Sequence, residues 1–132
     1  MRKISLSVFA AMFTLGVCGA SAAHDWRSQV PDKEKARENP FPSDAATVAA
    51  GAKVYAEHCA KCHGTDASGH GRRPSLRSNR VRTATDGELF WLLRNGELRY
   101  GMPSWSALPE EQRWQAERYI KSLPPDTSSN QR

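Results

Sequence analysis

Two cysteines and a histidine lie close together near the middle of the chain, in the sequence Cys59-Ala60-Lys61-Cys62-His63. Thiols at this spacing can bind a metal, form a redox-active pair or anchor a cofactor. A zinc site needs further cysteine or histidine ligands at matching spacing, and a thioredoxin-like pair needs a βαβ setting that this sequence does not predict. The histidine directly after the second cysteine favours covalent attachment of c-type haem.

Haem attachment assigns a role to each residue of the motif. The thiols of Cys59 and Cys62 add to the vinyl groups of haem, and the imidazole of His63 then lies where it can reach the iron. The sequence therefore predicts one covalently bound haem c, with His63 as the first axial ligand. The iron needs a second axial ligand from elsewhere in the chain.

Three side chains are candidates for that second ligand: Met102, His58 and His70. His58 precedes the attachment motif on the same helix turn, so it is badly placed to reach the other face of the haem. His70 lies on a short glycine-rich loop, where a solvent-exposed position is expected. Met102 lies between Gly101 and Pro103, on a loop with enough chain to pass round a haem edge. We expect Met102 to be the ligand.

Three helices are predicted to position these residues. The first begins at Asp44, with Asp44 or Thr47 as its cap, and carries an apolar stripe. The second begins with a capping box at Thr85 and ends at Gly96; the third begins near Pro109 and ends before Pro124. The stripe of the first helix is Val48, Ala52, Tyr55 and Cys59; that of the third is Trp114, Ala116, Tyr119, Ile120 and Leu123. Residues 64–82 are predicted as loop, and no β-hairpin signal occurs, so the fold class is all-α.

The ends of the chain differ from this domain in composition. Two basic residues, an apolar stretch and then small residues predict a secretory signal at 1–23. An uncleaved membrane anchor and lipidation at Cys18 are the alternatives, although Val17 is larger than the residue expected before a lipidated cysteine. Residues 24–43 are predicted as an extended polar arm or linker, 44–124 as the haem domain and 125–132 as a disordered tail. Export predicts a periplasmic protein, with membrane contact only if the signal is retained.

The net charge of +5 is mild, and two of its basic residues lie in the predicted signal. Nucleic-acid binding is therefore not expected. The positive charge is concentrated in one segment that holds no acidic residue. Its arginines are Arg72, Arg73, Arg77, Arg80 and Arg82. Such a segment can be solvated surface, or it can steer the protein onto an acidic patch of a redox partner.

The chain resembles the class I, mitochondrial-like cytochromes c, and among them the small monohaem domains of bacterial respiratory chains. The resemblance covers about residues 47–123. It rests on Cys59-Ala60-Lys61-Cys62-His63-Gly64, Gly69-His70-Gly71 leading to Pro74 and Leu76, Asp86-Gly87-Glu88-Leu89-Phe90, Asn95-Gly96, Gly101-Met102-Pro103-Ser104-Trp105 and residues 114–123. It implies a cytochrome c-like fold of three main helices and loops around one haem. The arm and the arginine segment are not explained by it.

The resemblance also implies two packing details. The carbonyl of Pro74 is expected to accept the ring N–H of His63, which makes Pro74 part of the haem site. Gly51 and Tyr55 of the first helix are expected to cross the last helix near Ala116 and Tyr119, with the glycine permitting close approach.

The ligand set predicts the function. An iron with both axial positions held by the protein carries single electrons and binds no substrate, so we expect a carrier between respiratory or dehydrogenase partners rather than an enzyme. These partners are redox proteins: a dehydrogenase, an oxidase or another cytochrome. Two alternatives stay open: a haem enzyme or small-ligand sensor in which Met102 dissociates, and a tethered cytochrome subunit of a dehydrogenase or oxidase complex.

Overall fold

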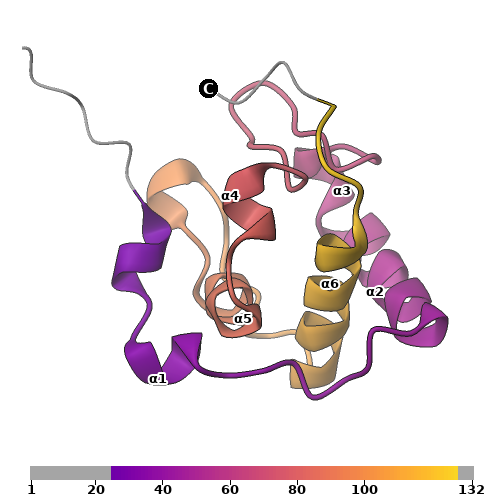
Figure 1. The fold of residues 1–132 in the computed structure, drawn as a ribbon. Helices are drawn as coiled ribbons and strands as arrows, with labels where there is room; N and C mark the ends of the chain where they lie inside the picture. The colour runs from indigo at the N-terminus through magenta and orange to yellow at the C-terminus, as the bar shows by residue number, and fades with distance from the viewer. Residues whose placement is uncertain (1–24, 128–132) are drawn as a thin grey trace, which may run out of the picture.

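The computed structural model describes residues 25–127, and the helices of this part surround the centre of the molecule (Figure 1). In chain order the elements are η1 (Trp26–Gln29), α1 (Asp32–Lys35), α2 (Ala45–His58), α3 (Ala60–His63), α4 (Asn79–Arg82), α5 (Asp86–Asn95), η2 (Leu98–Tyr100) and α6 (Glu110–Ser122). Between residues 25 and 127 the only β structure consists of two isolated bridges. The predicted all-α fold is confirmed. The predicted signal at 1–23 and the end of the tail, 128–132, lie outside the described residues.

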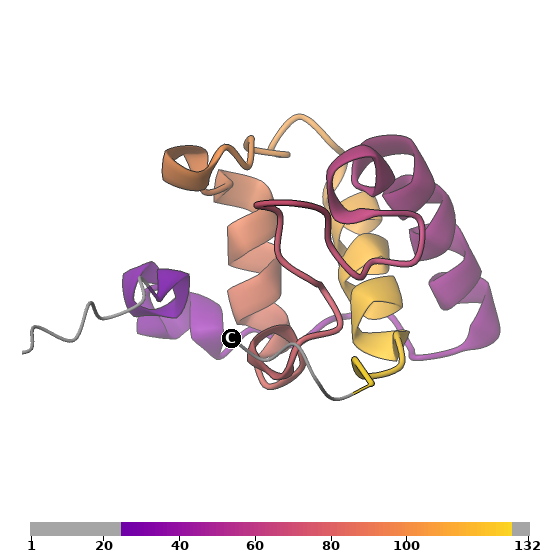
Figure 2. The ribbon, with the colours of Figure 1, turned by 90° about the horizontal axis from the view of Figure 1, so that it is seen from above.

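Helices α2 and α6 cross at a glycine. The Asp44 side chain caps α2 by accepting the Thr47 backbone N–H at 2.8 Å, as one of the two predicted caps. At Gly51 a Cβ atom would lie 2.0 Å from the carbonyl oxygen of Gln115, so only glycine allows the two helices to approach this closely. The two helices lie side by side in Figures 1 and 2.

One helical turn after Gly51, the contact between α2 and α6 is made by aromatic side chains. The rings of Tyr55 on α2 and Tyr119 on α6 lie 5.2 Å apart between centroids. Side chains of α2 and α6 thus meet where the resemblance places the crossing.

Helix α5 begins and ends as the sequence predicts. The Thr85 hydroxyl accepts the Glu88 N–H at 3.1 Å, and the Glu88 carboxylate accepts the Thr85 N–H at 2.8 Å, which completes the capping box. The helix ends at Gly96, whose φ of 71° suits a residue without a Cβ atom. Its Phe90 ring stacks on Trp114 of α6 with centroids 3.8 Å apart.

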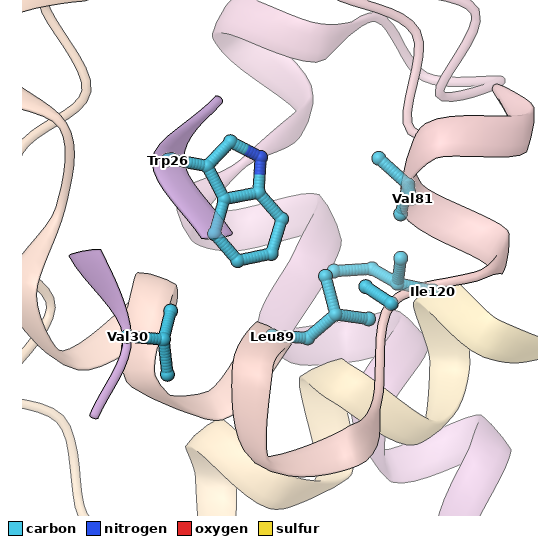
Figure 3. Packing of buried hydrophobic residues seen from close by; sticks show 6 residues of the cluster. Trp26, Val30, Val81, Leu89 and Ile120 are labelled. Carbon is cyan, nitrogen blue, oxygen red and sulfur yellow. The ribbon is translucent and has the colours of Figure 1, made fainter. Parts of the chain in front are cut away.

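The prediction of an extended arm is corrected by the structure for residues 25–43. This segment forms η1 and α1, and the side chains of Trp26 and Val30 are only 8% and 3% exposed. Both belong to a hydrophobic cluster with Val81, Leu89 and Ile120 (Figure 3). Two apolar residues in a polar segment give no periodicity in the sequence, so the helical structure of this segment could not be predicted. It is stabilised by packing of these two side chains against distant parts of the chain.

The prediction of loop throughout 64–82 is also corrected, because Asn79–Arg82 form the one-turn helix α4. Its Val81 is buried in the same cluster as Trp26. One helical turn is too short to show a hydrophobic period.

Within residues 25–127 no helix is long and apolar enough to cross a bilayer.

A carboxylate is buried between α6 and the N-terminal segment. Glu117 is fully buried, and the Asn39 side-chain amide donates to its carboxylate and, at 2.8 Å, to the Trp114 carbonyl. Burial raises the pKa of Glu117 to about 7; nearby Asp86 also raises it, while the Asn39 bond and the cations Arg118 and Lys121 lower it.

This raised pKa predicts how stability depends on pH. Because the folded pKa of Glu117 lies above its unfolded value of 4.5, the stabilisation is complete below pH 4.5 and is lost as the pH rises through about 7. We expect Glu117→Gln to gain stability relative to the wild type between pH 5 and 8, by on the order of 3 kcal/mol. Urea unfolding at several pH values measures this, with Glu111→Gln on the exposed face of α6 as control. Wild-type and Glu117→Gln curves that run parallel over this range would contradict it.

Candidate functional site

A cavity of about 660 Å³ lies between α5, α6 and the loops that follow α3 and η2. This volume is within the range of about 300–1,000 Å³ typical of small-molecule and cofactor sites. Apolar side chains form most of its wall. They are Trp26, Leu76, Val81, Leu89, Leu92, Leu93, Trp105 and Ile120. Such a wall suits a large, flat and mainly apolar group.

All five residues that the sequence predicts for the site line this one cavity: Cys59, Cys62, His63, Pro74 and Met102. They come from the end of α2, from α3, from the following loop and from the loop after η2. The structure therefore brings together residues that lie up to 43 positions apart in the sequence.

The attachment motif is positioned by the end of α2 and the single turn of α3. The Cys59 N–H donates to the Tyr55 carbonyl at 2.8 Å, so the helix continues to the first thiol. The Tyr55 hydroxyl donates to the Gly64 carbonyl at 2.5 Å and thereby fixes the turn just after His63. Burial raises the pKa of Tyr55 to about 12, which keeps the hydroxyl protonated as a donor.

The two thiols of the motif are not joined to each other. Cys59 is partly buried and Cys62 is exposed. Burial, with a smaller contribution from Cys62, raises the pKa of the Cys59 thiol to about 11. Within residues 25–127 no group of three or more histidine, cysteine or acidic side chains could hold a metal ion, so the zinc interpretation has no ligand set there.

The ring of His63 has a fixed orientation. Its Nδ1 atom lies 3.0 Å from the Pro74 carbonyl oxygen. A carbonyl oxygen only accepts, so Nδ1 carries the proton and Nε2 keeps its lone pair for a ligand. The loop that brings Pro74 there turns at Gly69, where φ is 86° and a Cβ atom would lie 2.5 Å from the Arg73 carbonyl oxygen.

Met102 is held on a short closed loop. Its backbone N–H and carbonyl both pair with Glu97, at 3.0 and 2.9 Å, and Gly101 turns the chain with a φ of 77°. Arg73 donates to the Tyr100 carbonyl at 2.8 Å and so ties this loop to the one that carries Pro74. No spacing or periodicity in the sequence indicates this role of Arg73, since it depends on two loops meeting.

The other two candidates for the second axial ligand are placed differently. His58 also lines the cavity, but its ring lies against Trp105, with centroids 5.3 Å apart. His70 is exposed and is not among the residues that line the cavity, and its backbone pairs with that of Arg73. Met102, in contrast to His70, lines the cavity, and it does so from a closed loop.

Most of the arginine segment makes contacts within the protein. Arg77 donates to the Pro124 carbonyl at 3.0 Å, and Arg80 donates to the Asp25 carboxylate at 3.0 Å. Arg73 donates to the Tyr100 carbonyl, as described above. The two other arginines of the segment, Arg72 and Arg82, are exposed, and no side-chain hydrogen bond or ion pair is found for them within residues 25–127. Of these, Arg72 lines the cavity mouth.

Known proteins resemble this chain in sequence and in fold. Residues 46–120 match the family described as cytochrome C oxidase, cbb3-type, subunit III. Cytochrome c550 of Pseudomonas aeruginosa is 30% identical over 105 residues, which cover 75% of this chain and 68% of that protein.

A solved structure shows the same fold. It is cytochrome CL of the marine methylotroph Methylophaga aminisulfidivorans, with a TM-score of 0.58 and 24% identity. The match covers 66% of this chain and 59% of that one, so the present chain spans somewhat less than two thirds of it.

The cavity fits the cofactor of these proteins, because it offers an apolar wall, two thiols at one end and an imidazole whose Nε2 is free to bind iron. The chain belongs to the class I monohaem c-type cytochromes, within the family described as cbb3-type cytochrome c oxidase subunit III, and it carries covalently bound haem c in electron transfer.

Proposed function

We propose that this cytochrome is a periplasmic carrier of single electrons, whose haem is attached to Cys59 and Cys62 and whose iron is bound by His63 and Met102. One observation carries the proposal: His63, oriented by Pro74, and Met102, presented by its closed loop, line the same cavity as the two thiols. The bound haem supplies a one-electron change of charge at iron.

The residues of the chain have separate tasks in this proposal. Cys59 and Cys62 keep the cofactor in one orientation by covalent bonds. The Pro74 carbonyl increases the electron density of the His63 imidazole and fixes its tautomer. The thioether of Met102 favours the reduced state of iron and occupies the position where a substrate would bind. With both positions held, no catalytic step is assigned to the protein.

The alternative of an enzyme or small-ligand sensor requires Met102 to leave and an acid or base to act beside it. Besides Glu97, His58 is a titratable side chain of the cavity wall that could take this part. Its contact with Trp105 instead supports a packing role. The family description names an oxidase subunit, and a tethered subunit would use the same site in the same way, with tighter binding to its partner.

Removal of the sulfur tests the ligand set. We expect Met102→Ala to abolish the weak near-infrared charge-transfer band that sulfur ligation gives to ferric haem, and to open the ferrous iron to carbon monoxide. Leu108→Ala is the matched control, because Leu108 packs against the same small cluster as Met102 and has no atom that can bind iron. If the wild type binds carbon monoxide readily, the sensor or enzyme alternative replaces the carrier.

The carrier meets other redox proteins, and we propose that its partner has an acidic docking patch. Arg72 at the cavity mouth and Arg82 on α4 are exposed and positive, and long-range attraction to such a patch raises the rate of encounter. The three remaining arginines of the segment support the fold through their internal bonds.

Salt dependence tests this surface. Electron transfer to the native partner should slow as ionic strength rises from 0.01 to 0.15 M, where the screening length falls from about 30 to about 8 Å. Arg72→Glu combined with Arg82→Glu should flatten this dependence. Lys33→Glu, an exposed charge reversal on α1, is the control. A wild-type rate that does not respond to salt would contradict the docking proposal.

A further inference from the structure

We propose that Trp26, held in place by residues 25–39, here called the N-terminal wall, closes one side of the haem cavity and raises the reduction potential by keeping water from the haem. The match to the cytochrome family begins at residue 46, so the wall lies outside the matched region. The proposal rests on haem binding in this cavity, and its near-infrared readout also rests on Met102 as the second axial ligand, as proposed above.

Trp26 connects the wall to the cavity. Its side chain is 8% exposed, it lines the cavity, and it packs in one cluster with Val81, Leu89 and Ile120, which line the cavity as well. Figure 3 shows the indole on η1 facing this group, with Val30 lower on the same segment. The indole is therefore part of the hydrophobic cluster and part of the cavity wall at the same time.

Bonds to α4 hold the first end of the wall. The Arg27 guanidinium donates to the Arg80 carbonyl and, at 3.3 Å, to the Thr83 hydroxyl. In return the Arg80 guanidinium donates to Asp25 at 3.0 Å. Trp26 lies between Asp25 and Arg27 in the chain, so these crossed bonds fix the residue that faces the cavity.

Contacts with α5 and α6 hold the other end. The Thr85 hydroxyl donates to the Lys35 carbonyl at 2.9 Å, and a Cβ atom at Gly87 would lie 1.9 Å from the Glu34 carbonyl oxygen. Farther along, the Asn39 amide donates to the Trp114 carbonyl at 2.8 Å. The wall is thus anchored on three helices and is part of the folded domain.

An apolar wall changes the balance between the two oxidation states. The oxidised haem carries one more positive charge than the reduced haem, and a charge is less stable where water is excluded. Burial of the cofactor therefore favours the reduced form and raises the potential. Truncation of the indole would leave a gap that water can enter beside polar groups of the haem.

Three variants and three readouts test the proposal on the haem-loaded protein. Potentiometric titration should give Trp26→Ala a lower reduction potential than the wild type, with Trp26→Phe in between. Trp91→Ala is the matched control, because Trp91 packs against the same cluster but is absent from the cavity wall. It should lower the melting temperature and leave the potential close to the wild-type value.

The near-infrared band shows whether a lowered potential comes from water entry or from loss of the sulfur ligand. The proposal expects this band to persist in Trp26→Ala and Trp26→Phe. It is overturned if both variants keep the wild-type potential, or if Trp91→Ala lowers the potential as much as Trp26→Ala. A lowered potential together with a lost band also overturns it, because ligand loss lowers the potential by itself. If Trp26→Ala does not fold, the same criteria apply to Trp26→Phe.

Discussion

The fold depends on an apolar cavity that its own side chains do not fill. One hydrophobic cluster, around Trp26, Leu89 and Ile120, and another, of Val54, Leu93 and Ala116, both adjoin it. The apolar side chains around this space of about 660 Å³ lack packing partners on the cavity side, and lost packing contacts of this kind destabilise a fold. Haem is therefore part of the core, and covalent attachment keeps it there.

The other contacts of the domain orient groups toward that cofactor. The close crossing at Gly51 sets the position of α2 against α6, and α2 carries the chain directly to Cys59. The Pro74 carbonyl fixes the ring of His63, and Arg73 joins the Pro74 loop to the loop of Met102. The loop that holds Pro74 and the loop that holds Met102 are thus linked through one guanidinium.

Local signals allowed much of this to be predicted from the sequence. The haem motif, the capping box at Thr85 and the prolines around the last helix each act through neighbouring residues, so their consequences can be read from short stretches. The bond from His63 to Pro74 was expected only through the family resemblance.

Contacts between distant segments could not be predicted in the same way. Trp26 and Val30 lie in a polar stretch without periodicity, and their burial depends on partners more than 50 residues away. The arginine segment looked like one charged surface, yet Arg77 and Arg80 bond to backbone or acidic groups near the two ends of the domain. The composition of a segment gives its net charge but does not indicate which groups its charged side chains contact in the folded protein.

One haem completes this core through bonds to both thiols. Intact-mass spectrometry under denaturing conditions tests it most directly, with the full chain co-expressed with haem-attachment machinery. We expect a polypeptide heavier by one haem, with Cys59 and Cys62 closed to alkylating reagents. A polypeptide without the added mass, in which both thiols react, would contradict it.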